Sequence, residues 1–237
     1  MSAMEQLDVV ILCGGQGTRL RSVVWDRPKP MAEISGRPFL DLLIDYASSY
    51  GLTRFVLCTG YQSEIIERYY QRYSGPLTII ISKEDAPLGT GGGVKLAGPK
   101  ILSDPFFVLN GDSYCPADLE AFTAYHLSRQ ASITLVVSET KTASDFGSII
   151  MEPTGRITSF QEKISAGRSL INAGIYLMKR SLLFRIPDQI NYSLEKDLFP
   201  ILAGNDMYCF ISSEPVLDIG TPDRYDLAKK LLSGKKY

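Results

Sequence analysis

The sequence predicts an α/β fold in which a mostly parallel sheet is flanked by helices and followed by a smaller β-rich lobe. Two observations lead to this prediction. In the first half of the chain, short apolar runs alternate with amphipathic segments that have the period of a helix. In the second half, short strand-like runs follow one another with turn residues between them. Because alternating strands and helices are typical of parallel sheets with both faces covered, the first half should form most of the sheet.

The first half is expected to supply four buried strands and three helices. The strands are expected at residues 9–13, 55–59, 77–82 and 106–109, and the helices at 39–50, at 62–73 and, more briefly, from 93–97. Gly51 marks the end of the first helix. Right-handed crossovers place the carboxyl ends of parallel strands along one edge, where Rossmann-like sheets bind their ligands.

The second half is expected to place the β-rich lobe over this edge. A helix is expected at 117–128, strands at 132–138, 148–151, 156–160 and 171–178, and further helices at 181–186, 193–203 and 223–232. Pro153-Thr154-Gly155 and Ser165-Ala166-Gly167 are typical of the turns that join such strands.

Composition indicates one soluble globular domain. The chain of 237 residues is 45% hydrophobic and 22% charged, and no linker or charge run divides residues 1–237. A net charge of −1 argues against a nucleic-acid or membrane-surface partner. No apolar run has transmembrane length, and the N-terminal run lacks the features of a signal peptide, so a cytoplasmic location is expected. Four scattered cysteines and one histidine, His126, predict neither a zinc site nor a histidine-based triad.

A glycine-rich loop follows the first expected strand, within DVVILCGGQGTRLRSVVWDRPKP at residues 8–30. Gly14, Gly15 and Gly17 permit a tight turn whose N–H groups suit an anion such as phosphate. Arg19 adds a permanent cation, and Lys29 adds a second one between two prolines that stiffen its segment.

Two better-known glycine motifs do not fit this loop. The dinucleotide fingerprint needs a third glycine where Leu20 stands, and the P-loop needs a Lys-Ser or Lys-Thr pair that does not follow Arg19.

Two aspartates end apolar strand-like runs. Asp112 follows Asn110-Gly111, and Asp218 follows Val216-Leu217. A carboxylate in such a place is costly unless it is paired, hydrogen-bonded or bound to metal. Either aspartate alone is more simply a turn or helix-cap residue, but as a pair beside the glycine loop they favour Mg²⁺, which takes one or two carboxylates with phosphate oxygens and water.

The glycine-rich loop, the lysine between prolines and several further motifs make the chain resemble the sugar-1-phosphate nucleotidyltransferases. The matching segments are GGQGTRL, RPKPM, PLGTGG (87–92), LNGD (109–112), FQEK (160–163), INAGIY (171–176) and LDIGTPDRY (217–225). Within the family, the chain is most similar to guanylyltransferases that act on manno-configured sugar phosphates, especially D-glycero-α-D-manno-heptose 1-phosphate. The resemblance implies a nucleotide-binding half at about 8–112 and a sugar-binding half at about 113–232.

The resemblance also implies a role for each site residue. Catalytic contacts to phosphate would come from Arg19, Lys29 and Lys163, and Mg²⁺ would be held by Asp112 and Asp218. The nucleotide would bind Leu12, Gly14, Gly15, Gly17, Thr18, Glu84, Gly89, Thr90, Asn110 and Gly111, and the sugar would bind Gly147, Glu162 and Asn172. Glu195 also matches the family pattern, but a negative charge in a first helical turn explains it equally.

In the family that the chain resembles, the loop at Glu84 reads the nucleobase, and a glutamate there favours guanine. An ionised carboxylate can accept from both adjacent donors of guanine, whereas uracil and thymine present one donor between two acceptors. The partners implied are therefore GTP and a sugar 1-phosphate, within a possible homo-oligomer. A uridylyl- or thymidylyltransferase that acts on a hexose 1-phosphate remains an alternative, as does a non-catalytic nucleotide-sugar sensor.

Overall fold

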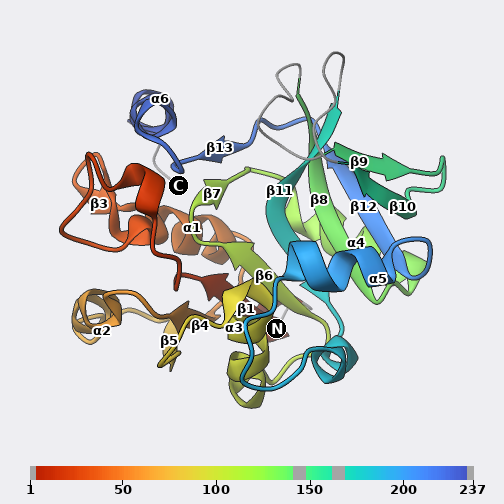
Figure 1. Ribbon diagram of the computed structural model, residues 1–237, viewed down its shortest axis with the longest axis horizontal. Helices are drawn as coiled ribbons and strands as arrows, with labels where there is room; N and C mark the ends of the chain where they lie inside the picture. Colours follow the sequence, from red (N-terminus) through yellow and green to blue (C-terminus); the bar gives the residue numbers. More distant parts are fainter. Residues whose placement is uncertain (1–3, 141–147, 162–168, 234–237) are drawn as a thin grey trace.

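A seven-stranded sheet forms the centre of the computed structural model, which describes residues 4–140, 148–161 and 169–233 (Figure 1). The strand order is β12-β8-β11-β6-β1-β4-β5, and only β11 runs antiparallel to its neighbours within this sheet. Its strands are β1 (Asp8–Leu12), β4 (Arg54–Thr59), β5 (Thr78–Lys83), β6 (Phe106–Asn110), β8 (Ile133–Thr140), β11 (Ser169–Met178) and β12 (Met207–Ser212). The predicted α/β fold with a mostly parallel, helix-flanked sheet is confirmed.

The register of the central strands explains where the glycine-rich loop lies. Leu12, the last residue of β1, pairs with Cys58 of β4 and with Asn110, the last residue of β6. The Gly111 N–H donates to the Leu12 carbonyl over 3.0 Å, so the turn after β6 is fastened to the end of β1. The glycine-rich loop and the Asn110-Gly111-Asp112 turn therefore leave the sheet side by side, at the carboxyl edge of the parallel strands.

Apolar side chains cover both faces of the sheet, as the alternation of a strand requires. Along β1, Val9 and Ile11 belong to one buried cluster and Val10 to the other. The first cluster is covered by α1 (Phe39–Ser48), α2 (Ser63–Tyr70), α4 (Leu119–Arg129) and α6 (Pro222–Leu232). The second is covered by α3 (Gly89–Ala97), the 3₁₀ helix Arg180–Arg185, the π-helix Leu194–Leu198 and α5 (Phe199–Leu202).

The second half of the chain contributes more to the central sheet than its pattern indicates. Strands β8, β11 and β12 extend the sheet beyond β6, and only β9 (Ser148–Met151) and β10 (Ile157–Gln161) form a separate hairpin. Strand β12 is absent from the elements expected from sequence, and α3 begins at Gly89, before the expected 93. The pairing of β12 with β8, which is distant in sequence, explains the missed strand, because a short local window does not record such contacts.

Two further short ladders lie outside the central sheet. β2 (Glu33–Ile34) pairs with β3 (Arg37–Pro38) just after the Pro-Lys-Pro segment. β7 (Ser113–Tyr114) pairs antiparallel with β13 (Leu217–Asp218), so Asp218 lies opposite Ser113. The β7–β13 ladder brings Asp218 next to the segment that follows the carboxyl end of β6. Within the described ranges, no helix has the length and apolarity needed to cross a bilayer.

Candidate active site

A cavity of about 320 Å³ opens at the carboxyl edge of the sheet. Eleven of the residues predicted for the site line it: Leu12, Gly14, Gly15, Gly17, Lys29, Glu84, Gly89, Thr90, Asn110, Gly111 and Asp112. Gln16, Pro30, Cys58, Pro87, Gly93 and Asn191 complete the lining. Among the described site residues, Thr18, Arg19, Asn172 and Asp218 lie outside this lining. Lys163, Gly147 and Glu162 fall outside the described residues.

The glycine-rich loop needs glycine for two different reasons. Gly17 has a φ of 58°, in the left-handed region, and a Cβ there would lie 3.2 Å from the Cβ of Lys29. Gly14 has an ordinary backbone, but a Cβ on it would lie 2.8 Å from a carboxylate oxygen of Glu84. Glycine therefore lets the loop turn beside the Lys29 segment at Gly17, and at Gly14 it leaves room for the Glu84 carboxylate. It continues into the 3₁₀ helix Thr18–Leu20, which carries Arg19 on an exposed surface.

Lys29 reaches directly to the turn after β6. Its Nζ lies 2.6 Å from Oδ2 of Asp112, and the Lys29 side chain is only 13% exposed. The Met31 N–H donates to the Pro28 carbonyl over 2.8 Å, so a short 3₁₀ helix holds the lysine in place. The predicted stiff tether thus brings a cation and a carboxylate together at the cavity wall.

The β7–β13 ladder brings the two predicted metal ligands to neighbouring positions. The Ile219 N–H donates to the Asp112 carbonyl over 3.0 Å, next to the Asp218–Ser113 pair. Oδ1 of Asp218 accepts from the Gly220 N–H over 2.8 Å. Arg19 lies close by, since a Cβ on Gly220 would be 3.7 Å from its Nη2.

The donor set fits a hard divalent cation. No group of three or more His, Cys, Asp or Glu side chains suited to a metal occurs in the part of the chain that the structure describes. Two aspartates on adjoining backbone segments match the one or two carboxylates that Mg²⁺ takes when phosphate oxygens and water supply the rest. Zinc sites in proteins typically include histidine nitrogen or cysteine sulfur ligands as well.

A buried polar network joins the cavity to the predicted sugar side. The fully buried Tyr176 hydroxyl accepts from Asn172 over 2.8 Å and from Asn110 over 3.4 Å, and it donates to Glu195 over 3.3 Å. Glu195 also accepts from the Thr90 hydroxyl over 2.7 Å. Burial raises the pKa of Tyr176, so the phenol stays protonated and can donate. Thr90, Asn110 and Asn172 are therefore held in one arrangement through two residues that are not among the predicted site residues.

Glu84 forms a negatively charged part of the cavity wall. Its backbone N–H donates to the Thr59 carbonyl over 2.9 Å, and its Oε2 accepts from the Leu88 N–H over 3.1 Å. Burial raises the pKa of this carboxyl group above its ordinary value. A ligand that donates hydrogen bonds to the ionised carboxylate would therefore stabilise it.

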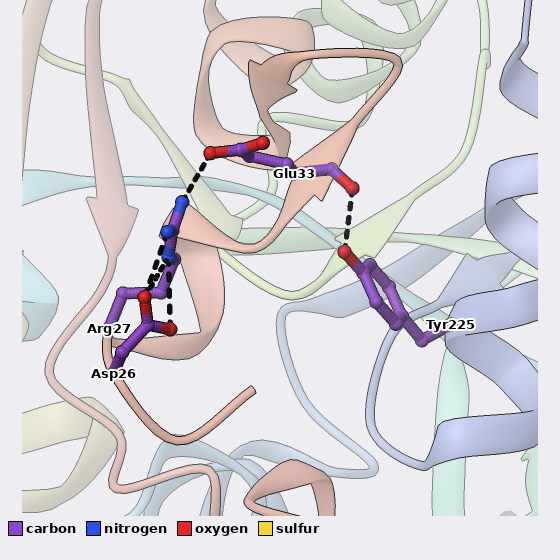
Figure 2. Close-up of polar contacts among 4 residues, drawn as sticks. All are labelled: Asp26, Arg27, Glu33 and Tyr225. Atoms are coloured by element: carbon purple, nitrogen blue, oxygen red, sulfur yellow. Dashed lines mark hydrogen bonds and ion pairs between the residues drawn. The ribbon is translucent and has the colours of Figure 1, made fainter. Parts of the chain in front are cut away.

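The C-terminal helix is fastened to the segment that surrounds Lys29 (Figure 2). Arg27 binds the carboxylates of Asp26 and Glu33, and the Tyr225 hydroxyl of α6 donates to the Glu33 carbonyl over 2.6 Å. Arg224, the residue before Tyr225, donates to Asp218 over 2.9 Å. Helix α6 thus contacts both the β2–β3 hairpin and the Asp218 carboxylate.

Comparison with known proteins agrees with this geometry. Residues 8–233 match the family model described as nucleotidyl transferase. The chain belongs to this family. The resemblance found in the sequence motifs to sugar-1-phosphate nucleotidyltransferases is confirmed, because near relatives in the nucleotidyl transferase family carry that activity in their names.

Three relatives illustrate the similarity. A D-glycero-alpha-D-manno-heptose 1-phosphate guanylyltransferase of Aneurinibacillus thermoaerophilus is 36% identical over 228 residues, which cover 95% of this chain and 98% of that protein. A mannose-1-phosphate guanylyltransferase of Mycobacterium tuberculosis is 34% identical, and the match covers 94% of this chain but 64% of that protein. The crystal structure of HddC from Yersinia pseudotuberculosis aligns with a TM-score of 0.85 at 33% identity, over 96% of this chain and 100% of that chain, and HddC is also known in a complex with GMP-PN.

Sequence reasoning missed several residues of this nucleotidyl transferase site. Glu195 matched a family segment and could have been included on that signal, and Tyr176 lies within the INAGIY block. Arg224 lies in the LDIGTPDRY block with Asp218 and could have been considered on that signal, but the block alone does not indicate that its guanidinium contacts Asp218. Gln16 and Asn191 line the cavity, and Gln16 could have been found from its place inside the glycine-rich loop.

Proposed function

We propose that the protein transfers a guanylyl group from GTP to a manno-configured sugar 1-phosphate, D-glycero-α-D-manno-heptose 1-phosphate in particular. The products are a GDP-sugar and pyrophosphate. The observation that carries the proposal is a phosphate-type glycine loop that shares one cavity with the Lys29–Asp112 pair and the Glu84 carboxylate. Its near full-length similarity to heptose 1-phosphate guanylyltransferases supports the same assignment.

In the proposed reaction, an oxygen of the sugar phosphate attacks the α-phosphorus of GTP. One P–O bond forms, the bond between the α-phosphorus and its bridging oxygen breaks, and pyrophosphate leaves with the electron pair. Two anions must approach each other, so positioning and positive charge supply most of the catalysis. We assign the triphosphate to the N–H groups of Gly14, Gly15 and Gly17, and the leaving pyrophosphate to Arg19.

Lys29 and the two aspartates are proposed to act together. Asp112 and Asp218 would hold Mg²⁺, which offsets the phosphate charge and orients the α-phosphate when it is bound. Lys29 lies 2.6 Å from Asp112, so its ammonium is positioned for the phosphoryl group at the same place. Lys163 is proposed as a further phosphate contact.

Specificity is proposed to come from two groups of residues, one for the nucleotide and one for the sugar. Glu84 would accept from the N1–H and the exocyclic amine of guanine, while Leu12, Gly89, Thr90, Asn110 and Gly111 complete the nucleotide site. Asn172, Glu162 and Gly147 would bind the sugar hydroxyls. We also propose that the reaction takes place in the cytoplasm.

Pyrophosphate release tests the proposal. Four nucleotides (GTP, UTP, dTTP and CTP) would each be mixed with several sugar 1-phosphates and Mg²⁺, and kcat/KM would be measured for each pair. We expect the highest value for GTP with the manno-configured heptose 1-phosphate. An Asp112→Asn variant, checked for folding by circular dichroism, gives the background from contaminants. A preference for UTP or dTTP would contradict the guanylyl assignment, and no release from any pair would indicate a sensor.

A further inference from the structure

Each of the two aspartates assigned to the metal has a cationic partner in the chain itself. Lys29 pairs with Asp112 over 2.6 Å, and Arg224 pairs with Asp218 over 2.9 Å. Lys29 belongs to the Pro-Lys-Pro segment that sequence motifs already assign to phosphate. Arg224 belongs to the first turn of α6, inside the LDIGTPDRY block, and it is not among the predicted site residues.

The Arg224–Asp218 pair is partly shielded from water. The side chain of Asp218 is 14% exposed and that of Arg224 is 25% exposed. A charge-assisted hydrogen bond in such a place is stronger than one on the open surface, where solvent screening removes most of its energy. The guanidinium is bonded to Oδ2, one of the two oxygens through which Asp218 could bind a cation.

The Asp218 carboxylate does not depend on Arg224 for its position. The Gly220 N–H holds Oδ1 from the other side over 2.8 Å. The backbone of Asp218 is fixed by its pairing with Ser113 and by the bond from the Ile219 N–H to the Asp112 carbonyl. Removing the guanidinium would therefore uncover the carboxylate without displacing it.

We propose that Arg224 competes with the divalent cation for Asp218 and so lowers the metal affinity of the site. This inference rests on the proposed function through its assignment of Asp218 as a metal ligand. In the metal-free protein, Arg224 neutralises the carboxylate. Metal binding must either displace the guanidinium from Oδ2 or proceed beside its positive charge, and both oppose binding. Arg19 also lies near this turn, and a variant at residue 224 removes the guanidinium that contacts Oδ2 while Arg19 is kept.

Mn²⁺ binding, followed by electron paramagnetic resonance of the free ion, tests the proposal without relying on activity. We expect Arg224→Gln to lower the Kd for Mn²⁺ by roughly 5- to 50-fold, the range expected when one charge-assisted hydrogen bond no longer competes. Arg224→Lys keeps the charge without the fork and should lie between the two. Lys229→Gln is the matched control, because it removes a positive charge from α6 at a residue that pairs with Asp226. Its Kd should equal that of the wild type.

The possible failures are distinguishable. An unchanged or higher Kd in both Arg224 variants, with Asp218→Asn weakening Mn²⁺ binding, would overturn the competition while leaving the metal site in place. An unchanged Kd in Asp218→Asn would overturn both the competition and the metal assignment. Pyrophosphate release by the wild type tests guanylyl transfer itself and does not depend on either result.

Discussion

Replacing Glu84 by glutamine removes one acceptor from the proposed guanine site while nearly keeping the size of the side chain. In the wild type, Oε2 accepts from the Leu88 N–H, and both oxygens retain lone pairs for the base. Glutamine keeps one oxygen and turns an N–H₂ group toward a guanine donor. Losing a hydrogen bond to a charged acceptor costs roughly 1–3 kcal/mol, so kcat/KM for GTP should fall about 5–150-fold. The value for UTP should fall less, which narrows the preference for GTP.

The pH dependence provides a second test of Glu84. Burial raises the pKa of its carboxyl group, and only the ionised form accepts from both guanine donors. As the pH falls toward this raised pKa, kcat/KM for GTP should decline in the wild type at a higher pH than for an ordinary glutamate. The same decline should be absent from Glu84→Gln. Asp85→Asn is the matched control, because it removes an exposed carboxylate from the next residue.

Steady-state kinetics with both nucleotides would decide the matter. If the wild type prefers UTP or dTTP, or if Glu84→Gln leaves the ratio of GTP to UTP unchanged, then guanine recognition through Glu84 is wrong. If Asp85→Asn changes the ratio as much as Glu84→Gln does, the effect is one of general charge and not of direct contact.

Three further predictions concern other parts of the molecule. Asp112→Asn and Asp218→Asn should each lower turnover by orders of magnitude with the fold intact by circular dichroism, and near-normal turnover in Mg²⁺ would contradict the metal assignment. Arg19→Lys should lose most activity because lysine lacks the fork that holds two phosphate oxygens, and wild-type turnover would leave Arg19 a general contributor of charge. Burial lowers the pKa of His126 to about 4. As the pH falls below 6.5, His126 is therefore protonated in the unfolded chain but stays neutral in the folded chain, which lowers the stability of the fold. Urea unfolding should therefore show the wild type losing about 2 kcal/mol more stability than His126→Gln between about pH 7 and 5, and equal losses would contradict this.

The glycine-rich turn, the Lys29 segment and the place of Asp112 could be predicted from sequence, because a few neighbouring residues determine the conformation of each. An apolar strand, a turn that needs glycine at Gly17 and a lysine held between prolines are each specified within a few neighbouring residues. The place of Asp112 follows in the same way from a buried strand and the turn after it. Once parallel strands are expected, their carboxyl ends must meet at one edge, and that suffices to bring the glycine-rich loop and Asp112 together.

Contacts between residues that are distant in the chain are determined only by the tertiary structure. The neighbouring positions of Asp112 and Asp218 depend on the β7–β13 ladder, and the Tyr176 network depends on the insertion of the antiparallel β11 between β6 and β8. The period of a strand tells which side chains share a face, but it does not tell which other strand lies alongside. The contact of Arg224 with Asp218 spans only six residues, but it also depends on how the first turn of α6 lies against β13, which carries this aspartate.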